Sequence, residues 1–187
     1  MTAAQAETKD LVNEAASGDA ASQYLTFILA GEEYGVEILR VQEIKGWDAV
    51  TPIPNTPEHV LGVLNLRGAI VPIVDLRKRF GLETVEFGKT TVVIVVRMQH
   101  DDQERTVGLV VDAVADVYRL DSDDVQPPPV MGTAIDTRFV KGLAVVEEQM
   151  VILLEIDDLI DFRVDGLAAS ANDSDARDVS NSEAAGN

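Results

Sequence analysis

The segment GVLNLRGAIVPIVDL (residues 62–76) has a counterpart later in the chain, GLAVVEEQMVILLEI (residues 142–156). When Gly62 is aligned with Gly142, the aliphatic positions agree almost throughout, and both segments close on an acidic residue followed by an aliphatic one. Each segment consists of two aliphatic runs around a polar turn, which is typical of two strands joined by a hairpin. The match predicts a β-rich unit that occurs twice.

A second alignment supports this duplication. YGVEILRVQEI (residues 34–44) lies over VGLVVDAVADV (residues 107–117) when Gly35 is aligned with Gly108. Any two β-meanders share aliphatic strands and a glycine, but here two blocks recur in the same order, with acidic residues at matching places. The second half holds seven extra residues between its blocks, around residues 121–137. We therefore favour true duplication with one insertion.

Short aliphatic runs bounded by Gly, Asp or Pro dominate the middle of the chain. They predict strands over residues 24–29, 68–74, 90–98, 106–111, 140–146 and 150–156. Helical signals are short: Asp75 is expected to cap a turn that ends at Phe80, and Asp157 to cap one that ends at Ile160. We expect an all-β fold of two small barrels with about five strands each, packed through a shared apolar seam.

The two ends differ in composition from the middle. Residues 1–21 and 165–187 are rich in Ala, Ser, Asn and Asp and carry few large apolar side chains. Such segments bury too little surface to offset the entropy lost on ordering. We expect a flexible N-terminal segment at residues 1–21, a folded domain of two barrel subdomains at residues 22–164, and an acidic disordered tail at residues 165–187.

Charge and cysteine content exclude several classes of protein. The 187 residues include 15 Lys and Arg against 33 Asp and Glu, a formal net charge of −18. Nucleic acids and anionic membrane surfaces would repel such a chain. The absence of cysteine excludes disulfide scaffolds and thiol catalysis, and no apolar run approaches the ~20 residues of a spanning helix. We expect a cytoplasmic protein that binds no nucleic acid and does not insert into membranes.

No set of residues predicts catalysis. His59 and His100 lie in no metal-binding spacing, and the glycines are scattered singly rather than gathered in a phosphate-binding loop. The pairs Asp123-Asp124 and Asp157-Asp158 could bind a cation, but turns and helix starts commonly carry exposed acidic residues. We expect no enzymatic activity, no cofactor and no metal.

Arg67 stands out because it is a cation in a predicted turn of a very acidic chain. The sequence Asn65-Leu66-Arg67-Gly68 joins two strands, so the Arg67 side chain is expected to project into solvent. Arginine is enriched at interface hot spots, since its planar fork pairs with carboxylates while its stem packs. On spacing alone, a solvated turn arginine is equally compatible, and Val41 and Ile44 upstream could be ordinary core residues.

Longer stretches resemble a known family. Residues 32–47, 51–81, 91–96 and 107–117, with the motifs YG, VQEI, NLRG and VPIVDLR, closely resemble the CheW family of bacterial chemotaxis coupling proteins. The resemblance covers roughly residues 22–162. It implies two SH3-like five-stranded barrels around a hydrophobic centre. It also implies a non-catalytic adaptor that joins methyl-accepting chemoreceptors to the histidine kinase CheA, at receptor arrays on the membrane.

The same resemblance implies where partners bind. Receptor cytoplasmic tips would dock in a groove between the subdomains, and the CheW-like regulatory domain of the kinase would dock on one barrel. The matching positions in this chain are Val41, Glu43, Gly62, Asn65, Arg67, Gly108 and Val114. Gly62 and Gly108 are expected to act indirectly, by permitting turns or close backbone approach.

Two further expectations depend on the whole chain. The sequence contains neither an ATP-binding module nor a receiver domain, so we expect the stand-alone form of the adaptor. The rival hypothesis is a small-molecule sensor with its ligand in the seam between the barrels. Most aliphatic residues are needed to fill two barrels, and the nine aromatic residues are few for lining a pocket.

Overall fold

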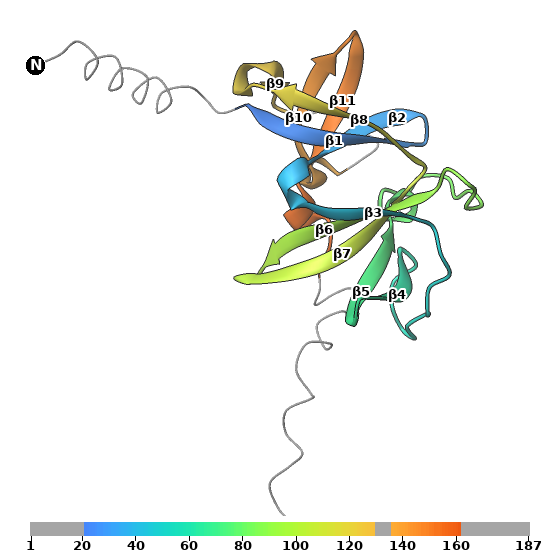
Figure 1. The fold of residues 1–187 in the computed structure, drawn as a ribbon. Helices are drawn as coiled ribbons and strands as arrows, with labels where there is room; N and C mark the ends of the chain where they lie inside the picture. Colours follow the sequence, from blue (N-terminus) through green and yellow to red (C-terminus); the bar gives the residue numbers. More distant parts are fainter. Residues whose placement is uncertain (1–20, 130–135, 162–187) are drawn as a thin grey trace, which may run out of the picture.

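The computed structural model describes residues 21–129 and 136–161, which form two curled β-sheets stacked as an upper and a lower barrel (Figure 1). The expected flexible segment at residues 1–21 and the acidic tail at residues 165–187 lie almost wholly outside the described residues. The described part is dominated by strands, which confirms the all-β prediction.

The upper barrel is a six-stranded sheet in the order β8-β1-β2-β11-β10-β9. Its strands are β1 (Ser22–Leu29), β2 (Glu32–Glu37), β8 (Ala113–Leu120), β9 (Val125–Gln126), β10 (Val140–Val146) and β11 (Gln149–Leu154). The lower barrel is a five-stranded sheet in the order β3-β6-β7-β5-β4. Its strands are β3 (Val41–Gly46), β4 (Val60–Leu66), β5 (Ala69–Asp75), β6 (Val92–His100) and β7 (Gln103–Val111). The upper barrel has a sixth strand because two residues, β9, pair with β10 there, whereas Thr51 at the equivalent place of the lower barrel forms a single bridge with Val63.

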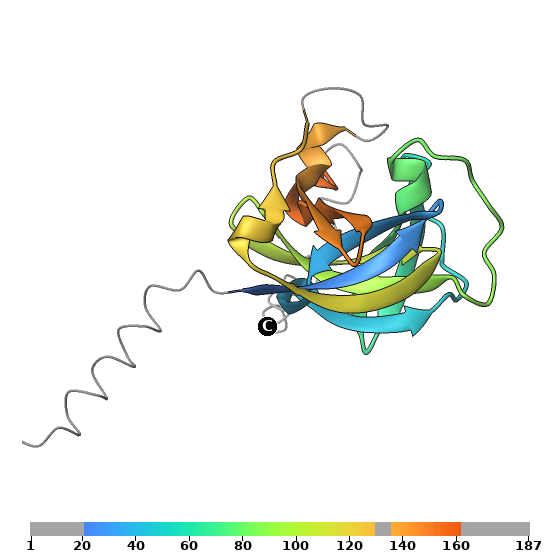
Figure 2. The same ribbon diagram turned by 90° about the horizontal axis from the view of Figure 1, so that it is seen from above.

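Each barrel is built from both repeats. The chain leaves the upper sheet after β2 through the short helix η1 (Ile38–Arg40), forms the lower sheet, and returns after β7 at Asp112. Each sheet therefore contains the first two strands of one repeat and the remaining strands of the other, three in the lower sheet and four in the upper sheet. Figure 2 shows the result, with β8 lying beside β1 although the two strands come from different halves of the chain.

Strand register confirms the duplication predicted from the sequence. Gly35 lies opposite Leu153 in the parallel pair of β2 and β11, and Gly108 lies opposite Ile73 in the parallel pair of β7 and β5. The two antiparallel hairpins β4-β5 and β10-β11 also shift register at matching places, just before Gly62 and just before the aligned Gly142. Both alignments thus place residues at equivalent points of the two barrels.

The seam between the barrels is the main hydrophobic core, as expected. Buried side chains from both sheets line it, including Leu25, Phe27, Leu29, Tyr34 and Val36 from above and Ile94, Val96, Met98, Leu109 and Val111 from below. Four aromatic rings cross it in a row, because Phe27 stacks on Tyr34, Tyr34 on Phe80, and Phe80 lies against Phe139, each with ring centroids 5.9 Å apart. A smaller apolar cluster fills the interior of each barrel.

The first predicted helical turn is confirmed and the second differs. The helix α2 (Leu76–Arg79) begins at Asp75, whose carboxylate accepts hydrogen bonds from the Arg77 and Lys78 N–H groups. The 3₁₀ helix η4 (Ile156–Asp158) begins instead at Glu155, with no side-chain cap. The prediction that Asp157 caps this turn is wrong, because its carboxylate binds Arg40 and the Gln99 N–H. The remaining 3₁₀ turns are η2 (Ser122–Asp124) and η3 (Thr137–Phe139).

Candidate protein-interaction surface

The turn between β4 and β5 projects Arg67 into solvent. Arg67 and Gly68 both adopt positive φ angles, 52° and 89°, which suits the right-handed twist of a two-residue hairpin turn. The Asn65 side-chain oxygen accepts a hydrogen bond from the Gly68 N–H at 2.8 Å and closes the turn. The Arg67 side chain is 88% exposed. The prediction of an exposed turn arginine, with glycine in the permissive position, is confirmed.

Arg67 lies against Glu43 across the open side of the lower barrel. Glu43 is on β3 and Arg67 follows β4, and these strands form opposite edges of the same sheet. The sheet curls far enough that Arg67 Nη2 lies 2.9 Å from Glu43 Oε2. An ion pair this exposed contributes only ~0–1 kcal/mol to stability. Both charges therefore remain available to a partner.

Gly62 and Gly108 are buried inside the lower sheet. A Cβ atom on Gly62 would lie 2.2 Å from the backbone oxygen of Thr51, and its φ of +148° is unfavourable for other residues. This contact belongs to the bridge in which Thr51 and Val63 exchange backbone hydrogen bonds. A Cβ atom on Gly108 would lie 2.5 Å from Ile73 Cδ1. Neither glycine presents a side chain to a partner.

Val41 and Val114 occupy equivalent positions in the two repeats. Val41 begins β3 and pairs with Val96, whereas Val114 lies on β8 and pairs with Phe27. Both valines are half-buried and pack on the edge of the core between the barrels. The structure therefore brings Glu43, Asn65 and Arg67 together at the turn between β4 and β5. Gly62 and Gly108 lie buried in the same sheet. Val41 and Val114 lie apart from them, at the seam between the barrels.

Exposed aliphatic side chains add features that the sequence reading missed. Leu39, in η1 at the first crossing between the barrels, is 81% exposed. Ile44, beside Glu43, and Ile70, just after the Arg67 turn, are also exposed, although Ile44 could have been core. The duplication offers a signal for them, because Val117 and Met150 at the aligned positions of the upper barrel are exposed too. Exposed apolar residues mark a protein-binding surface where they form a contiguous patch.

Comparison with known proteins identifies the family. Residues 23–163 match the family model described as a CheW-like domain. The chain belongs to the CheW-like family. Chemotaxis protein CheW of Klebsiella aerogenes is 43% identical over 149 residues, which is 80% of this chain and 87% of that protein. Chemotaxis protein CheW of Rhizobium meliloti is 38% identical over 135 residues, 72% of this chain and 84% of that protein.

A solved structure agrees with the CheW-like fold. The crystal structure of the scaffolding protein TtCheW from Thermoanaerobacter tengcongensis matches with a TM-score of 0.69 and 38% identity. The match covers 75% of this chain and 88% of that one. The resemblance read from the NLRG and VPIVDLR motifs is thereby confirmed at the level of family and fold.

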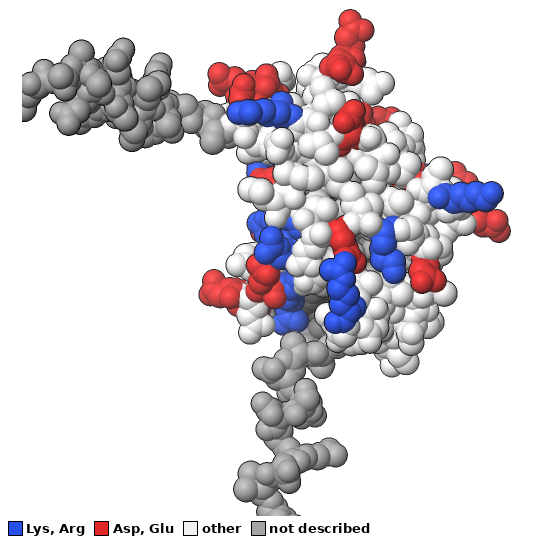
Figure 3. Space-filling view, viewed as in Figure 1, with Lys and Arg blue, Asp and Glu red and all other residues white. Residues whose placement is uncertain are grey.

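The charges of this CheW-like chain are distributed unevenly. On the face shown in Figure 3, most Lys and Arg side chains lie over the lower barrel, although the chain as a whole is strongly acidic. The turn of the upper barrel that is equivalent to Arg67-Gly68 is Glu147-Glu148, also at positive φ. The two barrels thus present opposite charges at the same point of the fold.

Residues 21–129 and 136–161 contain neither a cluster of metal ligands nor a membrane-spanning helix. No three His, Asp or Glu side chains gather there as ligands for a metal ion. Within the same ranges, no helix has both the length and the apolar character needed to span a membrane.

Proposed function

We propose that this CheW-family protein is a non-catalytic chemotaxis adaptor that couples methyl-accepting chemoreceptors to the histidine kinase CheA. One observation carries the proposal: a CheW-like domain spans residues 23–163, and so comprises nearly all of the described structure. The relatives named above are chemotaxis proteins, and the solved neighbour is described as a scaffolding protein. The adaptor would work in the cytoplasm, recruited to membrane-associated receptor arrays.

The adaptor would act through geometry, without chemistry of its own. Receptor tips would bind near the groove between the barrels, and the CheW-like regulatory domain of CheA would bind one barrel. The receptor can change kinase activity only if its states differ in their contacts with the adaptor or the kinase. A protein that holds both partners in one assembly supplies that coupling. No cofactor and no nucleic acid enter this scheme.

Arg67 is proposed as the central charged contact. Its side chain is 88% exposed, and the ion pair with Glu43 leaves guanidinium donors facing solvent. A carboxylate on the partner can therefore join the pair without displacing Glu43. Asn65 would hold the turn in place, while Gly62 and Gly108 would act indirectly, since both are buried where a Cβ atom would overlap neighbouring atoms. Val41 and Val114 would contribute apolar surface at the seam.

A ligand-sensing barrel is less well supported. The seam between the barrels, where this hypothesis places the ligand, is filled by buried side chains of both sheets, among them Phe27, Tyr34 and Leu109. Separate apolar clusters fill the interiors of the two barrels. A small molecule in the seam would have to displace this core. The family assignment also favours the adaptor.

Co-sedimentation tests the proposal directly. Receptor cytoplasmic fragments assembled on vesicles are mixed with CheA and the purified protein, and the pellet is assayed for all three components and for kinase activity. We expect the protein to pellet with receptors, to increase the amount of CheA recovered, and to make kinase activity respond to attractant. Failure of the wild-type protein to recruit CheA would contradict the adaptor function.

A further inference from the structure

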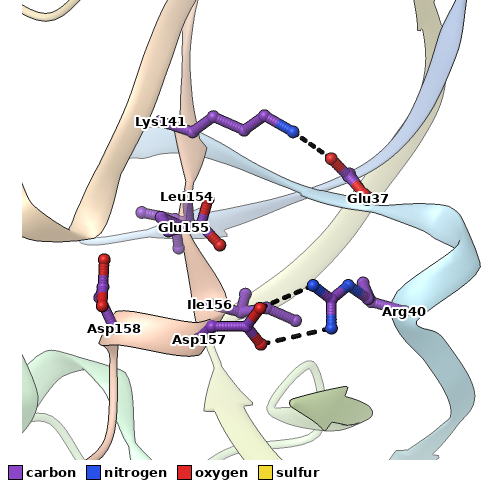
Figure 4. Close-up of a pocket in the computed structure, with 8 residues that line it drawn as sticks. All are labelled: Glu37, Arg40, Lys141, Leu154, Glu155, Ile156, Asp157 and Asp158. Atoms are coloured by element: carbon purple, nitrogen blue, oxygen red, sulfur yellow. Dashed lines mark hydrogen bonds and ion pairs between the residues drawn. The ribbon is translucent and has the colours of Figure 1, made fainter. Parts of the chain in front are cut away.

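The chain crosses between the two barrels at two points, and an arginine–carboxylate pair lies at each. At the first crossing, Arg40 of η1 binds Asp157 of η4 (Figure 4). At the second crossing, Asp112 binds Arg77 of α2. Arg77 and Asp157 are aligned with one another in the duplicated sequence. The two pairs thus occupy related places with the charges exchanged.

Each carboxylate also ties one barrel to the other. Asp157, which follows the last strand of the upper barrel, accepts a hydrogen bond at 2.7 Å from the Gln99 N–H on β6 of the lower barrel. Asp112, where the chain leaves the lower barrel, accepts one at 2.8 Å from the Ala30 N–H in the upper barrel. The shared core is apolar and holds the barrels together without fixing a direction. These directional bonds are therefore suited to setting the angle between the barrels.

The two pairs differ in strength. Arg77 donates to both oxygens of Asp112, at 2.8 and 2.6 Å, and to the Glu83 carbonyl oxygen at 2.7 Å. Its side chain is only 13% exposed. Arg40 donates to Asp157 at 2.7 and 3.3 Å and to the Arg97 carbonyl oxygen at 3.4 Å, with 31% of its side chain exposed. Both pairs are bidentate and their carboxylates are similarly exposed, 26% for Asp112 and 25% for Asp157. The Arg77–Asp112 pair has the shorter bonds and the less exposed arginine, so it is the harder one to open.

The weaker pair also borders an open pocket. A cavity of about 340 Å³ lies between Arg40 and Asp157 on one side and Glu37 and Lys141 on the other. Figure 4 shows these two ion pairs at opposite ends of the group of lining residues. Solvent, salt and a partner's charged side chain can therefore reach the Arg40–Asp157 pair.

We propose that Arg40–Asp157 is a releasable latch between the barrels and that Arg77–Asp112 is the fixed one. When the first pair opens, the barrels turn by a small angle about the second crossing. Interfaces with alternative packings commonly move in this way, by hinge or shear about a few residues. This conformational device concerns the protein alone and does not depend on which partners it binds.

Distances between the barrels provide the test. The natural chain has no cysteine, so nitroxide labels can be attached at Arg119→Cys on β8 and Glu104→Cys on β7, both exposed. Pulsed electron–electron double resonance then reports the distribution of distances between the label on the upper barrel and the label on the lower barrel. We expect one narrow distance in the otherwise wild-type protein, and a broadened or second distance in Arg40→Ala and in Asp157→Asn. Asparagine keeps an oxygen that can accept from the Gln99 N–H.

Three controls test whether the broader distance distribution comes from loss of the Arg40–Asp157 contact or from a general loss of stability. The Arg40→Ala/Asp157→Asn double variant should be no broader than either single variant, because all three lose the same contact. Arg138→Ala removes an exposed ion pair between Arg138 and Asp136, which are two residues apart in sequence. This variant should leave the distance distribution narrow. Raising the salt concentration to 1 M should broaden the wild-type distribution but not that of Arg40→Ala.

Two results would overturn the proposal. One is an unchanged distribution in both Arg40→Ala and Asp157→Asn. The other is a distribution in Arg77→Ala that is broadened as much as in Arg40→Ala while the protein stays folded by circular dichroism, since the two latches would then be equal. Arg77→Ala is expected instead to lower the urea midpoint more than Arg40→Ala does.

Discussion

The two barrels share one strand order but differ in what they carry. The lower barrel has a wholly apolar interior, topped by Trp47 packed on Phe87 at 4.3 Å between ring centroids. The upper barrel buries Glu33 of β2, and its Oε1 atom has no hydrogen-bond partner among the described residues. The hairpin turns differ in the same way, with Arg67-Gly68 below and Glu147-Glu148 above.

The difference shows which features the duplicated fold requires. Both repeats keep the glycines where strands approach closely, the register shifts and the paired crossings, because these determine how the backbone packs. Charges at the turns and polar groups near the barrel ends are free to diverge, since they do not alter the strand order. Divergence of this kind gives one protein two different contact surfaces on one architecture.

The largest expected effect is the loss of stability in Gly62→Ala, compared with Gly142→Ala at the matching register shift of the upper barrel. Gly62→Ala places a Cβ atom 2.2 Å from Thr51 O at a φ of +148°, whereas Gly142→Ala meets Val125 Cγ1 at 2.5 Å without a positive φ. We expect Gly62→Ala to cost on the order of 3 kcal/mol, from strain and overlap together. A Cβ atom on Gly142 would also lie 2.9 Å from the Gln126 backbone oxygen. Gly142→Ala should cost about 1–2 kcal/mol, less than Gly62→Ala, because its nearest neighbour is a side-chain atom that can shift. Urea denaturation measures both.

Gly88→Ala is the matched control for these glycines, because no atom lies within 4 Å of its added Cβ. It should leave the unfolding free energy nearly unchanged. Equal losses in Gly62→Ala and Gly142→Ala would show that the backbone constraint is the same in both barrels.

Charge reversal at the turns tests the functional asymmetry. Arg67→Glu should leave the circular dichroism spectrum unchanged, since exposed substitutions shift stability by only ~0.5 kcal/mol. It should weaken receptor binding by ~2 kcal/mol or more, about thirtyfold, through loss of a hot-spot arginine and repulsion from an acidic partner. Binding to CheA should be less affected. Two separate titrations, one with receptor fragments and one with CheA, measure these effects.

The Arg67→Glu/Glu43→Arg double variant decides what Arg67 does. If Arg67 only closes the barrel edge, exchanging the charges restores the ion pair and receptor binding together. We expect binding to stay weak, because the partner meets a negative turn. Glu147→Arg, the equivalent turn of the upper barrel, serves as the control and should not mimic the defect. Unchanged receptor affinity in Arg67→Glu would refute the assignment.

The Arg77–Asp112 pair is expected to lose its stabilising contribution at acidic pH, when the Asp112 carboxylate becomes protonated. Burial tends to raise the pKa of the Asp112 carboxyl, but hydrogen bonds from Arg77 and the Ala30 N–H, with the Arg77 charge, outweigh it and lower that pKa below 3.8. Its stabilising contribution is therefore present above pH ~3.8 and is lost as the pH falls through the folded-state pKa.

Asp112→Asn should consequently be less stable than wild type by about 1.5 kcal/mol at neutral pH. The difference should shrink as the pH falls through the folded-state pKa of Asp112. Urea midpoints measured between pH 7 and pH 2 follow both proteins, with the exposed Asp123→Asn as control. A difference that stays constant down to pH 2 would contradict this account of Asp112.

The smallest expected effect is a gain in stability. Glu33 in β2 is aligned with Thr106 of the other repeat, and burying a carboxylate oxygen without a partner is costly. Glu33→Thr should therefore raise the unfolding free energy by about 0.5–1 kcal/mol. Glu32→Thr, exposed on the same strand, should change it little. A clear loss of stability in Glu33→Thr would show that the carboxylate has a structural role.

The all-β class, the duplication and the family could all be predicted from the sequence. Strand alternation, turn residues such as Asn65 and Gly68, and the capping Asp75 are local signals, so they can be read without a structure. The exposed turn position of Arg67 followed for the same reason.

The way in which the two repeats share their strands could not be predicted without the folded structure. Exchange of strands between barrels, the Glu43–Arg67 contact across a sheet edge, and the Arg40–Asp157 pair all join residues far apart in sequence. The sequence alone assigned Asp157 to a helix cap, because capping is a local preference. Its actual partners, Arg40 and the Gln99 N–H, reach it only once both barrels have closed around their common core.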